Sequence, residues 1–377
     1  MTRTQKLEKL QSDIVNSIGE RGTAEIATGV GKTIISFKWL YKYVPKYSKV
    51  TFFAETTVRE KTLLDEAKKF KEIYNLDVTS DYDISFCCYQ SLPITDSIAH
   101  IYDEIHDMLT PVYQACWFMN QPKYCIGLSA FIPNIPLDKL DFDSPTKLDI
   151  LNQFAPVKFR YSISQAVEEG ILSPFEISVK YYEFDNTVKS MLGGTKAKPV
   201  PMTEFEYFKY FDSRRKNFMM NHIYRGVCGK RVSDLLQSTK SPVPIAKKVL
   251  ENPAKTVVFG VDINVLLEIT PNVISSRNSK VVNQKIIDDF NAGKINTIGS
   301  FKMLKQGITL EGVERVLLVS YYSTEVDFLQ RLGRGVRWVE DKIAKVIILK
   351  HKTSEMQDKW FNTMLGEFDK TLIKYES

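Results

Sequence analysis

Residues 24–36, AEIATGVGKTIIS, place the triplet Gly-Lys-Thr directly after a short apolar run, and these residue types bind the phosphates of nucleotides. The run predicts a strand and the following segment a helix, so the turn between them would direct backbone N–H groups at phosphate oxygens. Lys32 would reach the β- and γ-phosphates, and Thr33 would bind Mg²⁺ through its hydroxyl. The alternative is a glycine-rich turn before an ordinary helix. We predict an ATP and Mg²⁺ site whose turn consists of Thr28, Gly29, Val30 and Gly31.

Residues 99–108, AHIYDEIHDM, supply a pair of carboxylates. Asp103 and Glu104 end an apolar run, so they would lie at the C-terminal edge of a strand, where parallel sheets bind ligands. Asp103 would complete the Mg²⁺ shell, and Glu104 would orient or deprotonate the attacking water. A solvated acidic turn is the alternative for this motif alone. Together with the Gly-Lys-Thr turn, the pair indicates nucleotide hydrolysis.

Residues 328–338, FLQRLGRGVRW, carry basic groups suited to the same reaction. Arg334 and Arg337 are three residues apart, so they share one helix face with Gln330 nearby. Guanidinium groups stabilise the charge that develops on a transferring phosphoryl group, and such an arginine can raise the rate by about 10³- to 10⁵-fold. The alternative is the solvated surface of a basic helix. We predict that the two arginines complete the catalytic set.

Apolar runs that predict strands alternate with helix-like segments in two series. The first series includes the segment 57–74, in which Leu63, Leu64, Ala67 and Phe70 fall at helical spacing. A second series begins near residue 255. Near-continuous apolar strands alternating with helices predict parallel sheets covered on both faces. We therefore expect two α/β domains, 1–180 and 181–377, with a linker or loop around residues 185–205, where glycine, proline and lysine cluster.

The composition excludes several classes of protein. The chain has 377 residues, 44% hydrophobic and 25% charged, which is typical of a globular protein with two domains. The net charge of +6 permits a polyanionic partner without requiring one. The cysteines and histidines lack the spacing of zinc sites, and we expect reduced thiols in a cytoplasmic protein, bacterial or in a phage-infected host. A polar N-terminus and the lack of a long apolar run predict no signal peptide and no membrane span.

The motifs, in this order, resemble those of the superfamily 2 helicases and translocases. ATGVGKT (27–33), DEIH (103–106), GLSA (127–130) and QRLGRGVR (330–337) resemble motifs I, II, III and VI. FFAETT (52–57), CYQSL (88–92), KTVVFG (255–260) and GSFKMLKQGITLEGV (299–313) resemble motifs Ia, Ib, IV and V. The resemblance implies two tandem RecA-like parallel-sheet domains with the ATP site in the cleft between them. The first domain would carry motifs I to III and the second motifs IV to VI.

The resemblance also extends the set of site residues. Gln11 is similar to the glutamine that reads adenine in this family, and Gly307 of motif V would join the nucleotide-binding residues. His106 of motif II and the Ser129-Ala130 pair of motif III would couple the nucleotide state to the nucleic acid. The catalytic set implied in this way is Lys32, Asp103, Glu104, Gln330, Arg334 and Arg337.

A nucleic-acid track is implied by motifs Ia, Ib, IV and V. Hydroxyls, amides and lysines there would contact phosphates, which positions a strand without specifying its sequence. The candidates are Thr56, Thr57, Gln90, Ser91, Ser300, Lys302 and Lys305. Residues 206–220 interleave aromatic and basic residues, which suits base stacking, but an amphipathic helix packing its aromatics on the second domain is the favoured interpretation.

The segment YSISQAVEEGILSPFEI (161–177) and motif VI resemble the DNA-directed branch, which includes phage branch-migration helicases, RadD-like proteins and restriction-enzyme motors. The implied function is an ATP-dependent DNA motor acting on single-stranded or branched DNA, with replication or recombination proteins as partners and a monomeric state. Two alternatives stay open. One is an RNA helicase with DExH character, and the other is an ATP-gated clamp that holds DNA without unwinding it.

Overall fold

The computed structural model describes residues 1–54, 58–91, 94–109, 117, 119–134, 145–194, 199–301, 310–321, 343–365 and 373–376. The chain divides into two compact units, with the boundary between Pro174 and Phe175. Each unit is built around a sheet of parallel strands with flanking helices, which confirms the predicted fold class of tandem RecA-like domains.

The first sheet has the strand order β3-β2-β4-β5-β1-β6, and all its described pairs are parallel. Strands β4 and β5 are buried along their whole length, as the continuous apolar runs predict. The strands are β1 (Arg21–Ile26), β2 (Lys49–Ala54), β3 (Asp83–Cys88), β4 (Ala99–Asp103), β5 (Tyr124–Ser129) and β6 (Val157–Tyr161).

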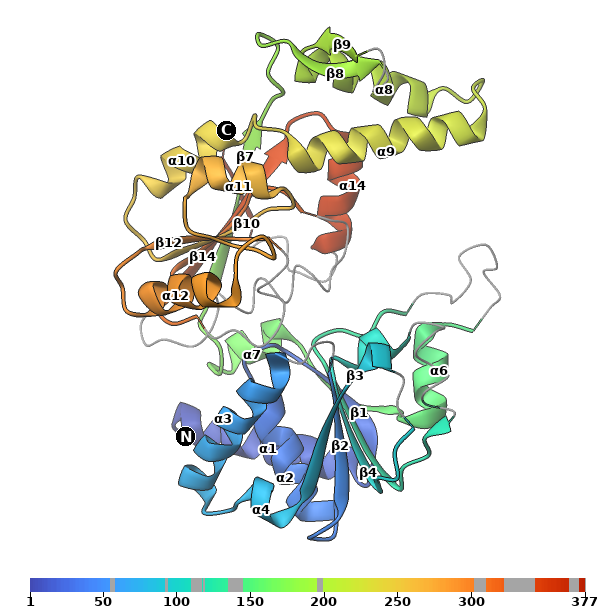
Figure 1. Ribbon diagram of the computed structural model, residues 1–377, viewed down its shortest axis with the longest axis vertical. Coiled ribbons are helices and arrows are strands. Elements are labelled where there is room, and N and C mark those ends of the chain that lie inside the picture. The colour runs from blue at the N-terminus through green and yellow to red at the C-terminus, as the bar shows by residue number, and fades with distance from the viewer. Residues whose placement is uncertain are drawn as a thin grey trace. The chain divides into compact units, whose positions relative to one another are not determined.

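Helices cover both faces of this sheet, with α1, α2 and α3 on one face and α6 on the other (Figure 1). Helix α1 begins after a capping box, in which Thr2 and Gln5 satisfy each other's backbone N–H groups. In α3 the buried face is formed by Leu63, Ala67 and Phe70, whereas Leu64, predicted to share it, is exposed. The first three are four and three residues apart, and Leu64 is turned away from that stripe. The helices are α1 (Arg3–Ile18), α2 (Lys32–Tyr43), α3 (Val58–Tyr74), α4 (Val78–Asp81), α6 (Lys147–Phe154) and α7 (Ile163–Glu168), and the short 3₁₀ helices are η1 (Tyr89–Ser91) and η2 (Ile105–Leu109).

The second sheet has the strand order β11-β12-β10-β13-β14-β7-β15, again with parallel described pairs. Figure 1 shows α10 and α11 on one face of this sheet and α12 on the other. The strands are β7 (Phe175–Tyr182), β10 (Thr256–Phe259), β11 (Val273–Ile274), β12 (Thr297–Ser300), β13 (Arg315–Leu318), β14 (Ala344–His351) and β15 (Ile373–Glu376). The helices are α8 (Glu204–Lys216), α9 (His222–Ser238), α10 (Val243–Leu250), α11 (Ile263–Ile269), α12 (Lys280–Asn291) and α14 (Glu355–Met364).

The start of the second unit differs from the sequence prediction. Strand β7 begins at Phe175 and pairs with β14 and β15, so the boundary precedes residue 180. Much of the expected linker is an antiparallel hairpin formed by β8 (Ser190–Gly194) and β9 (Pro199–Met202). The hairpin contacts α8, and the buried side chains of α8 and α9 belong to the core of the second unit. Turn-forming residues are typical of hairpins as well as linkers, and composition alone does not distinguish the two.

The segment 206–220 behaves largely as the favoured interpretation predicts. Tyr207, Phe208 and Phe211 of α8 are buried in the core of the second unit. Tyr210 is exposed, with the guanidinium of Arg214 3.4 Å from its ring centroid.

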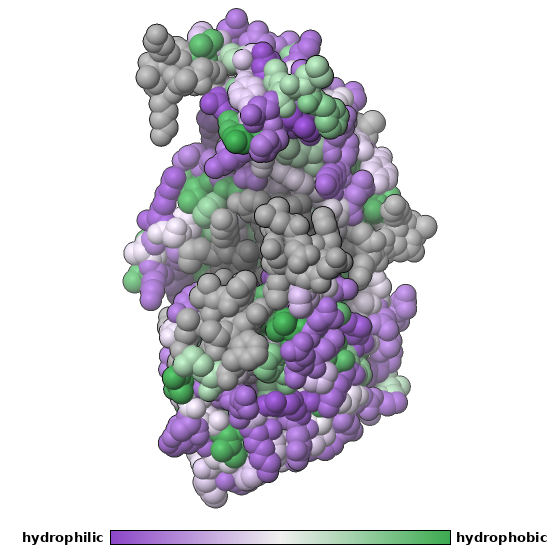
Figure 2. All heavy atoms as spheres, turned by 90° about the vertical axis from the view of Figure 1, so that its right-hand side faces the viewer, coloured by the Kyte–Doolittle hydropathy of each residue, from purple (hydrophilic) through white to green (hydrophobic). Residues whose placement is uncertain are grey.

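In the described part of the chain, no helix is long and apolar enough to cross a membrane. On the face shown in Figure 2, apolar side chains are scattered among hydrophilic ones.

Candidate functional site

The predicted phosphate-binding turn joins β1 to α2 in the first unit. Gly29 and Gly31 have φ values of +96° and +89°, in the left-handed region that favours glycine. Gly31 is the N-cap of α2 and provides no side-chain hydrogen bond to the helix. The N–H groups of the first turn of α2 therefore have no side-chain cap from this residue, which leaves a partial positive charge for an anion.

The buried amide of Gln11 supports the turn from α1. Its Nε2 donates to the Val30 carbonyl at 3.0 Å, and its Oε1 accepts from Lys38 Nζ at 2.9 Å. A Cβ atom on Gly31 would lie 2.8 Å from Gln11 Nε2, so a side chain there would also displace the amide that supports the turn. The Oγ1 of Thr28 is buried without a hydrogen-bond partner among the described residues. These contacts shape the predicted turn, and adenine recognition by Gln11 stays a prediction.

The two predicted carboxylates lie at the end of β4, which ends at Asp103. Asp103 and Glu104 are both less than 10% exposed, and Glu104 has φ +53°, a left-handed conformation that is uncommon for a residue other than glycine. Such strain is typical of functional sites and requires surrounding contacts to hold it. Lys32 Nζ supplies one, at 2.7 Å from Glu104 Oε1. The structure therefore brings the lysine of the turn and the second carboxylate into direct contact.

Glu104 is held as an anion in spite of its burial. Burial by itself would raise the pKa of this carboxyl, but Lys32, His106 and the N–H of Ala130 outweigh that effect and lower the pKa to about 2. The Ala130 N–H donates to Glu104 Oε2 at 3.5 Å. An anionic carboxylate can accept hydrogen bonds only, so Glu104 is in the state that a water-orienting group or general base requires.

Strand β5 lies between β4 and β1 and brings the two motifs together. Its Gly127 has no side chain, and a Cβ there would lie 2.4 Å from Ile105 Cδ1 and 2.6 Å from Thr23 Oγ1. The absence of a side chain on Gly127 therefore lets Ile105, immediately after Glu104, approach β1 closely. The residue after Glu104 therefore packs beside β1, the strand that leads into the predicted turn.

The predicted coupling residues surround Glu104. His106 Nδ1 lies 2.8 Å from Ser129 Oγ and 3.5 Å from Glu104 Oε2. Ser129 Oγ also donates to the carbonyl of Phe131 at 2.7 Å. Motif II and motif III are thus connected by hydrogen bonds in the first unit, through the side chains that the resemblance assigns to coupling.

Arg59, near the start of α3, was not predicted as a site residue. Its Nε donates to Asp103 Oδ2 at 2.6 Å, and its Nη2 donates to Thr33 Oγ1 at 3.3 Å. Burial would lower the pKa of Arg59, but Asp103, Glu66 and Glu104 outweigh it and raise the pKa. A basic residue shortly after a strand of the first series was the only signal in the sequence, and it does not show which strand lies next to β2.

The contacts of Arg59 test whether a metal ion would fit. One guanidinium reaches both the Thr33 hydroxyl and the Asp103 carboxylate, so these two oxygens face a common point. A hydroxyl and a carboxylate are hard oxygen ligands, and Mg²⁺ commonly takes one or two such protein ligands together with phosphates and water. The residues predicted to bind the metal therefore fit that role.

The predicted nucleic-acid residues fall into three groups. Gln90 and Ser91 are exposed in η1 (Tyr89–Ser91), at the carboxyl edge of the first sheet. Ser300, at the end of β12, is buried, and its Oγ has no partner among the described residues. The other predicted residues, catalytic ones included, lie outside the described residues: Thr56, Thr57, Lys302, Lys305, Gly307, Gln330, Arg334 and Arg337.

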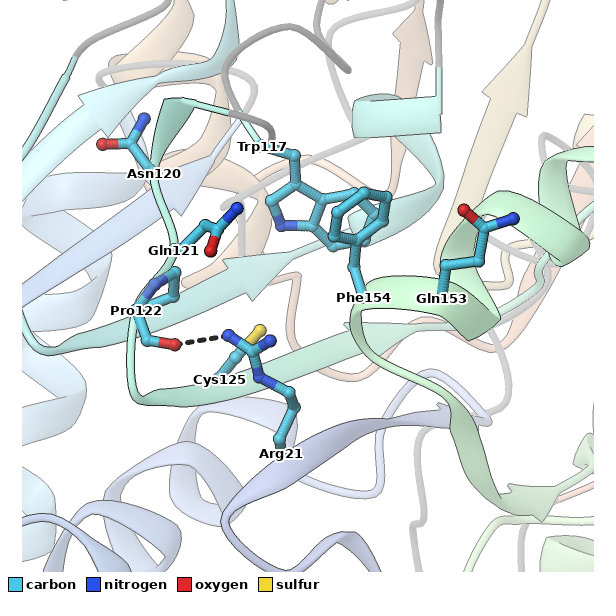
Figure 3. Close-up of a pocket in the computed structure, with 8 residues that line it drawn as sticks. All are labelled: Arg21, Trp117, Asn120, Gln121, Pro122, Cys125, Gln153 and Phe154. Atoms are coloured by element: carbon cyan, nitrogen blue, oxygen red, sulfur yellow. Dashed lines mark hydrogen bonds between the residues drawn. The ribbon is translucent and has the colours of Figure 1, made fainter.

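A separate pocket of about 220 Å³ lies in the first unit, away from these motifs (Figure 3). Arg21 at the start of β1 and Cys125 near the start of β5 place it toward the amino edge of the sheet. Figure 3 shows the ring of Trp117 stacked on Phe154, with Arg21 directed at the carbonyl of Pro122. The carboxylates and the phosphate-binding turn lie at the opposite, carboxyl edge.

Comparison with known families finds two matches along the chain. The model described as "Type III restriction enzyme, res subunit" matches residues 4–134, and the model described as "Helicase conserved C-terminal domain" matches residues 249–339. The first match contains the phosphate-binding turn and both carboxylates, and the second contains Arg334 and Arg337. No curated protein gives a significant match.

Several solved structures are similar in fold. The ATP-dependent Type ISP restriction-modification enzyme LlaBIII bound to DNA has a TM-score of 0.63 at 14% identity, covering 100% of this chain and 31% of that one. The Mycobacterium smegmatis helicase Lhr bound to ssDNA and AMP-PNP has a TM-score of 0.53 at 14% identity, covering 93% and 47%. Saccharomyces cerevisiae Dbp5 bound to RNA and ADP BeF3 has a TM-score of 0.57 at 12% identity, covering 94% and 85%. The chain thus spans about a third of the restriction enzyme and about half of Lhr.

Proposed function

Since this chain belongs to superfamily 2 of the helicases and translocases, a class of ATP-hydrolysing nucleic-acid motors, we propose that it couples ATP hydrolysis to movement along DNA. The observation that carries the proposal is the arrangement at the carboxyl edge of the first sheet. Lys32 contacts Glu104 at 2.7 Å, while Thr33 and Asp103 face a common point. The groups that phosphoryl transfer to water requires thus lie together.

The residues of the first unit would act as follows. The backbone N–H groups at the start of α2 would bind the β-phosphate, and Lys32 would leave Glu104 to contact the γ-phosphate. Glu104, released from the lysine, would accept a hydrogen bond from the attacking water and orient it. Thr33 and Asp103 would hold Mg²⁺, which neutralises negative charge on the β- and γ-phosphate oxygens when it is bound. Arg334 and Arg337 stay predicted to supply guanidinium charge to the transition state.

The hydrogen bonds between motif II and motif III support a coupling role. His106 lies within 3.5 Å of Glu104 and within 2.8 Å of Ser129. A movement of the Glu104 carboxylate would therefore alter the contacts of Ser129 at the end of β5. Gln90 and Ser91 lie at the same edge of the sheet and are exposed. We propose that nucleotide state reaches the nucleic-acid track through His106 and Ser129.

The choice of DNA rests on the DNA-directed motif resemblance and on the similarity of residues 4–134 to a restriction-enzyme subunit. An RNA motor is the competing function, and the fold similarity to the RNA-bound Dbp5 structure keeps it open. An ATP-gated clamp that does not unwind DNA is the other alternative. The finer proposal is a phage-like monomeric motor that acts in the cytoplasm on single-stranded or branched DNA, beside replication or recombination proteins.

The Glu104→Gln variant tests the ATPase assignment. The amide has nearly the same shape as the carboxylate but cannot act as a base, so we expect nucleic-acid-stimulated ATP hydrolysis to fall by at least about 10²-fold. Binding of a fluorescent ATP analogue would show that the site still assembles. Exposed Glu72 of α3, changed to glutamine, is the matched control and should leave the rate unchanged. Full activity in Glu104→Gln would contradict the proposal.

Nucleic-acid preference is tested separately. ATPase rates with single-stranded DNA, duplex, forked DNA and RNA of matched sequence should be highest with DNA. Higher stimulation by RNA would favour the RNA motor. A strand-displacement assay on forked DNA then separates a helicase from a clamp or a pure translocase, which would hydrolyse ATP without opening the duplex.

A further inference from the structure

The side chain of Arg59 contacts both of the residues proposed to bind the metal ion. Its Nε lies 2.6 Å from Asp103 Oδ2, and its Nη2 lies 3.3 Å from Thr33 Oγ1. We propose that Arg59 occupies the metal position in the nucleotide-free protein as a resident cation, and that Mg²⁺ enters with nucleotide by displacing it. This inference rests on the proposed function, because the metal site is that of the proposed ATPase.

The distances do not leave room for both cations. A Mg²⁺ ion binds oxygen ligands at about 2.0–2.1 Å. An ion bound to both Asp103 Oδ2 and Thr33 Oγ1 would therefore lie in the space that the guanidinium nitrogens of Arg59 hold, at 2.6 and 3.3 Å from the same oxygens. Metal binding by these two ligands requires Arg59 to move.

The burial of the pair explains why a cation is needed there at all. The Asp103 and Arg59 side chains are 7% and 14% exposed. A buried carboxylate without a partner is strongly unfavourable, and here the guanidinium of Arg59 satisfies it. A free metal ion would have to replace this charge-assisted hydrogen bond, whereas a metal–nucleotide complex adds phosphate contacts at Lys32 and α2 that offset the loss. Arg59 would thereby make metal binding depend on nucleotide.

Glu66 offers the displaced arginine another partner. It lies two turns after Arg59 on α3, on the same side of the helix, and attracts the same guanidinium electrostatically. Its Oε2 is buried and has no hydrogen-bond partner among the described residues. Rotation of Arg59 from Asp103 to Glu66 would keep its charge paired while the metal position is vacated.

Binding of Mn²⁺, a paramagnetic substitute for Mg²⁺, to the nucleotide-free chain tests the proposal without any hydrolysis. Electron paramagnetic resonance titration should show that Arg59→Gln binds one Mn²⁺ about tenfold or more tightly than the wild type, because a charge-assisted competitor has been removed. Adding Asp103→Asn to Arg59→Gln should abolish that site. The matched control is Arg160→Gln, whose arginine forms an exposed ion pair with Glu25 in the same unit and should change nothing.

Two further measurements keep the test decisive. Far-UV circular dichroism would establish that Arg59→Gln is folded, and a folded variant that binds Mn²⁺ no more tightly than the wild type would overturn the proposal. Glu66→Gln retains both Arg59 and Asp103, and it should weaken Mn²⁺·ADP binding because the displaced arginine loses its second partner. Unchanged Mn²⁺·ADP affinity in a folded Glu66→Gln protein would remove Glu66 from the proposal.

Failure of the proposed function would look different. If the wild type does not hydrolyse ATP with any nucleic acid, the motor assignment fails. A Mn²⁺ site gained in Arg59→Gln and lost with Asp103→Asn would still establish the arginine as the occupant of a metal site. Conversely, an active ATPase without that gain would leave the motor intact and exclude the role of Arg59.

Discussion

The two sheets share a parallel architecture but differ in how far the ion-paired side chains at their carboxyl edges are exposed. In the first unit, the pairs Lys32–Glu104 and Arg59–Asp103 have side chains no more than 14% exposed at either end. In the second unit, Lys350 of β14 is 8% exposed, but its partner Asp358 is 44% exposed. One edge buries both members of each pair, whereas the other lets the acidic member reach water.

The difference indicates that the first unit buries charged pairs, at a cost in folding stability, where we propose that ATP is hydrolysed. Buried ion pairs seldom stabilise a fold, because desolvation opposes their attraction, and breaking one leaves a costly unpaired charge. Lys350 also packs over the rings of Tyr181 and Phe361, at 5.2 and 5.9 Å, so its contact is largely structural. Each of the two buried pairs of the first unit instead joins two groups proposed to act on ATP or its metal.

The largest expected contrast is between Lys32→Met and Lys350→Met, which remove the cation and keep an unbranched apolar chain. Lys32→Met leaves Glu104 buried without its lysine, which is its closest charged partner, and should destabilise the first unit by about 3–5 kcal/mol. Lys350→Met leaves an aspartate that water can solvate and should cost the second unit about 1 kcal/mol or less. Hydrogen exchange followed by mass spectrometry reports each unit separately.

Addition of Glu104→Gln to Lys32→Met should restore most of the stability, because neither residue of this pair is then charged. Equal destabilisation by the two lysine variants would remove the distinction between the edges.

The next prediction concerns stability at low pH, which should fall by a similar amount in the two units. His100 of β4 and His351 of β14 are buried, and burial lowers the pKa of each to about 4. Below about pH 6.5 the unfolded chain binds protons that the folded chain does not, so stability falls as the pH drops toward 4. The shift of each pKa corresponds to a loss of up to about 3 kcal/mol per histidine.

Calorimetric unfolding between pH 7 and pH 4.5 measures this loss. His100→Gln and His351→Gln should each flatten the pH dependence of the unit that carries the substitution. A pH profile left unchanged by both substitutions would show that other groups govern acid stability.

The smallest expected changes in stability come from substituting two glycines. One, in the first unit, has close neighbours, and the other, in the second unit, has space for a side chain. Gly127→Ala would place a Cβ within 2.6 Å of Thr23 and Ile105 and should cost about 1–3 kcal/mol. Gly226 lies inside α9, and no described atom would come within 4 Å of its added Cβ. Gly226→Ala should therefore stabilise the second unit by about 0.5–1 kcal/mol. Thermal unfolding of the two variants checks both signs, and a stabilised Gly127→Ala would contradict the packing described for β5.

Much of the fold and the core of the site could be predicted from local patterns. The apolar runs that became β2, β4, β5, β10 and β14 are continuous because these strands are covered on both faces. The glycines of the turn and the acidic pair at the end of β4 could be identified as candidates from their residue types and spacing. The exposure of Leu64 and the assignment of β7 to the second sheet were missed, because they depend on which neighbours each element finds.

The sequence by itself determined the parallel α/β architecture and the glycine turn before α2, and it supplied Lys32, Thr33, Asp103 and Glu104 as the predicted site residues. Tertiary structure alone decided that Arg59 lies against Asp103. Strand β2, which precedes Arg59, pairs with β4, which ends at Asp103, although the two residues are 44 positions apart. Spacing along the chain does not encode strand order, because many orders satisfy the same apolar pattern. The partner of a buried charge can therefore be identified only from the assembled sheet.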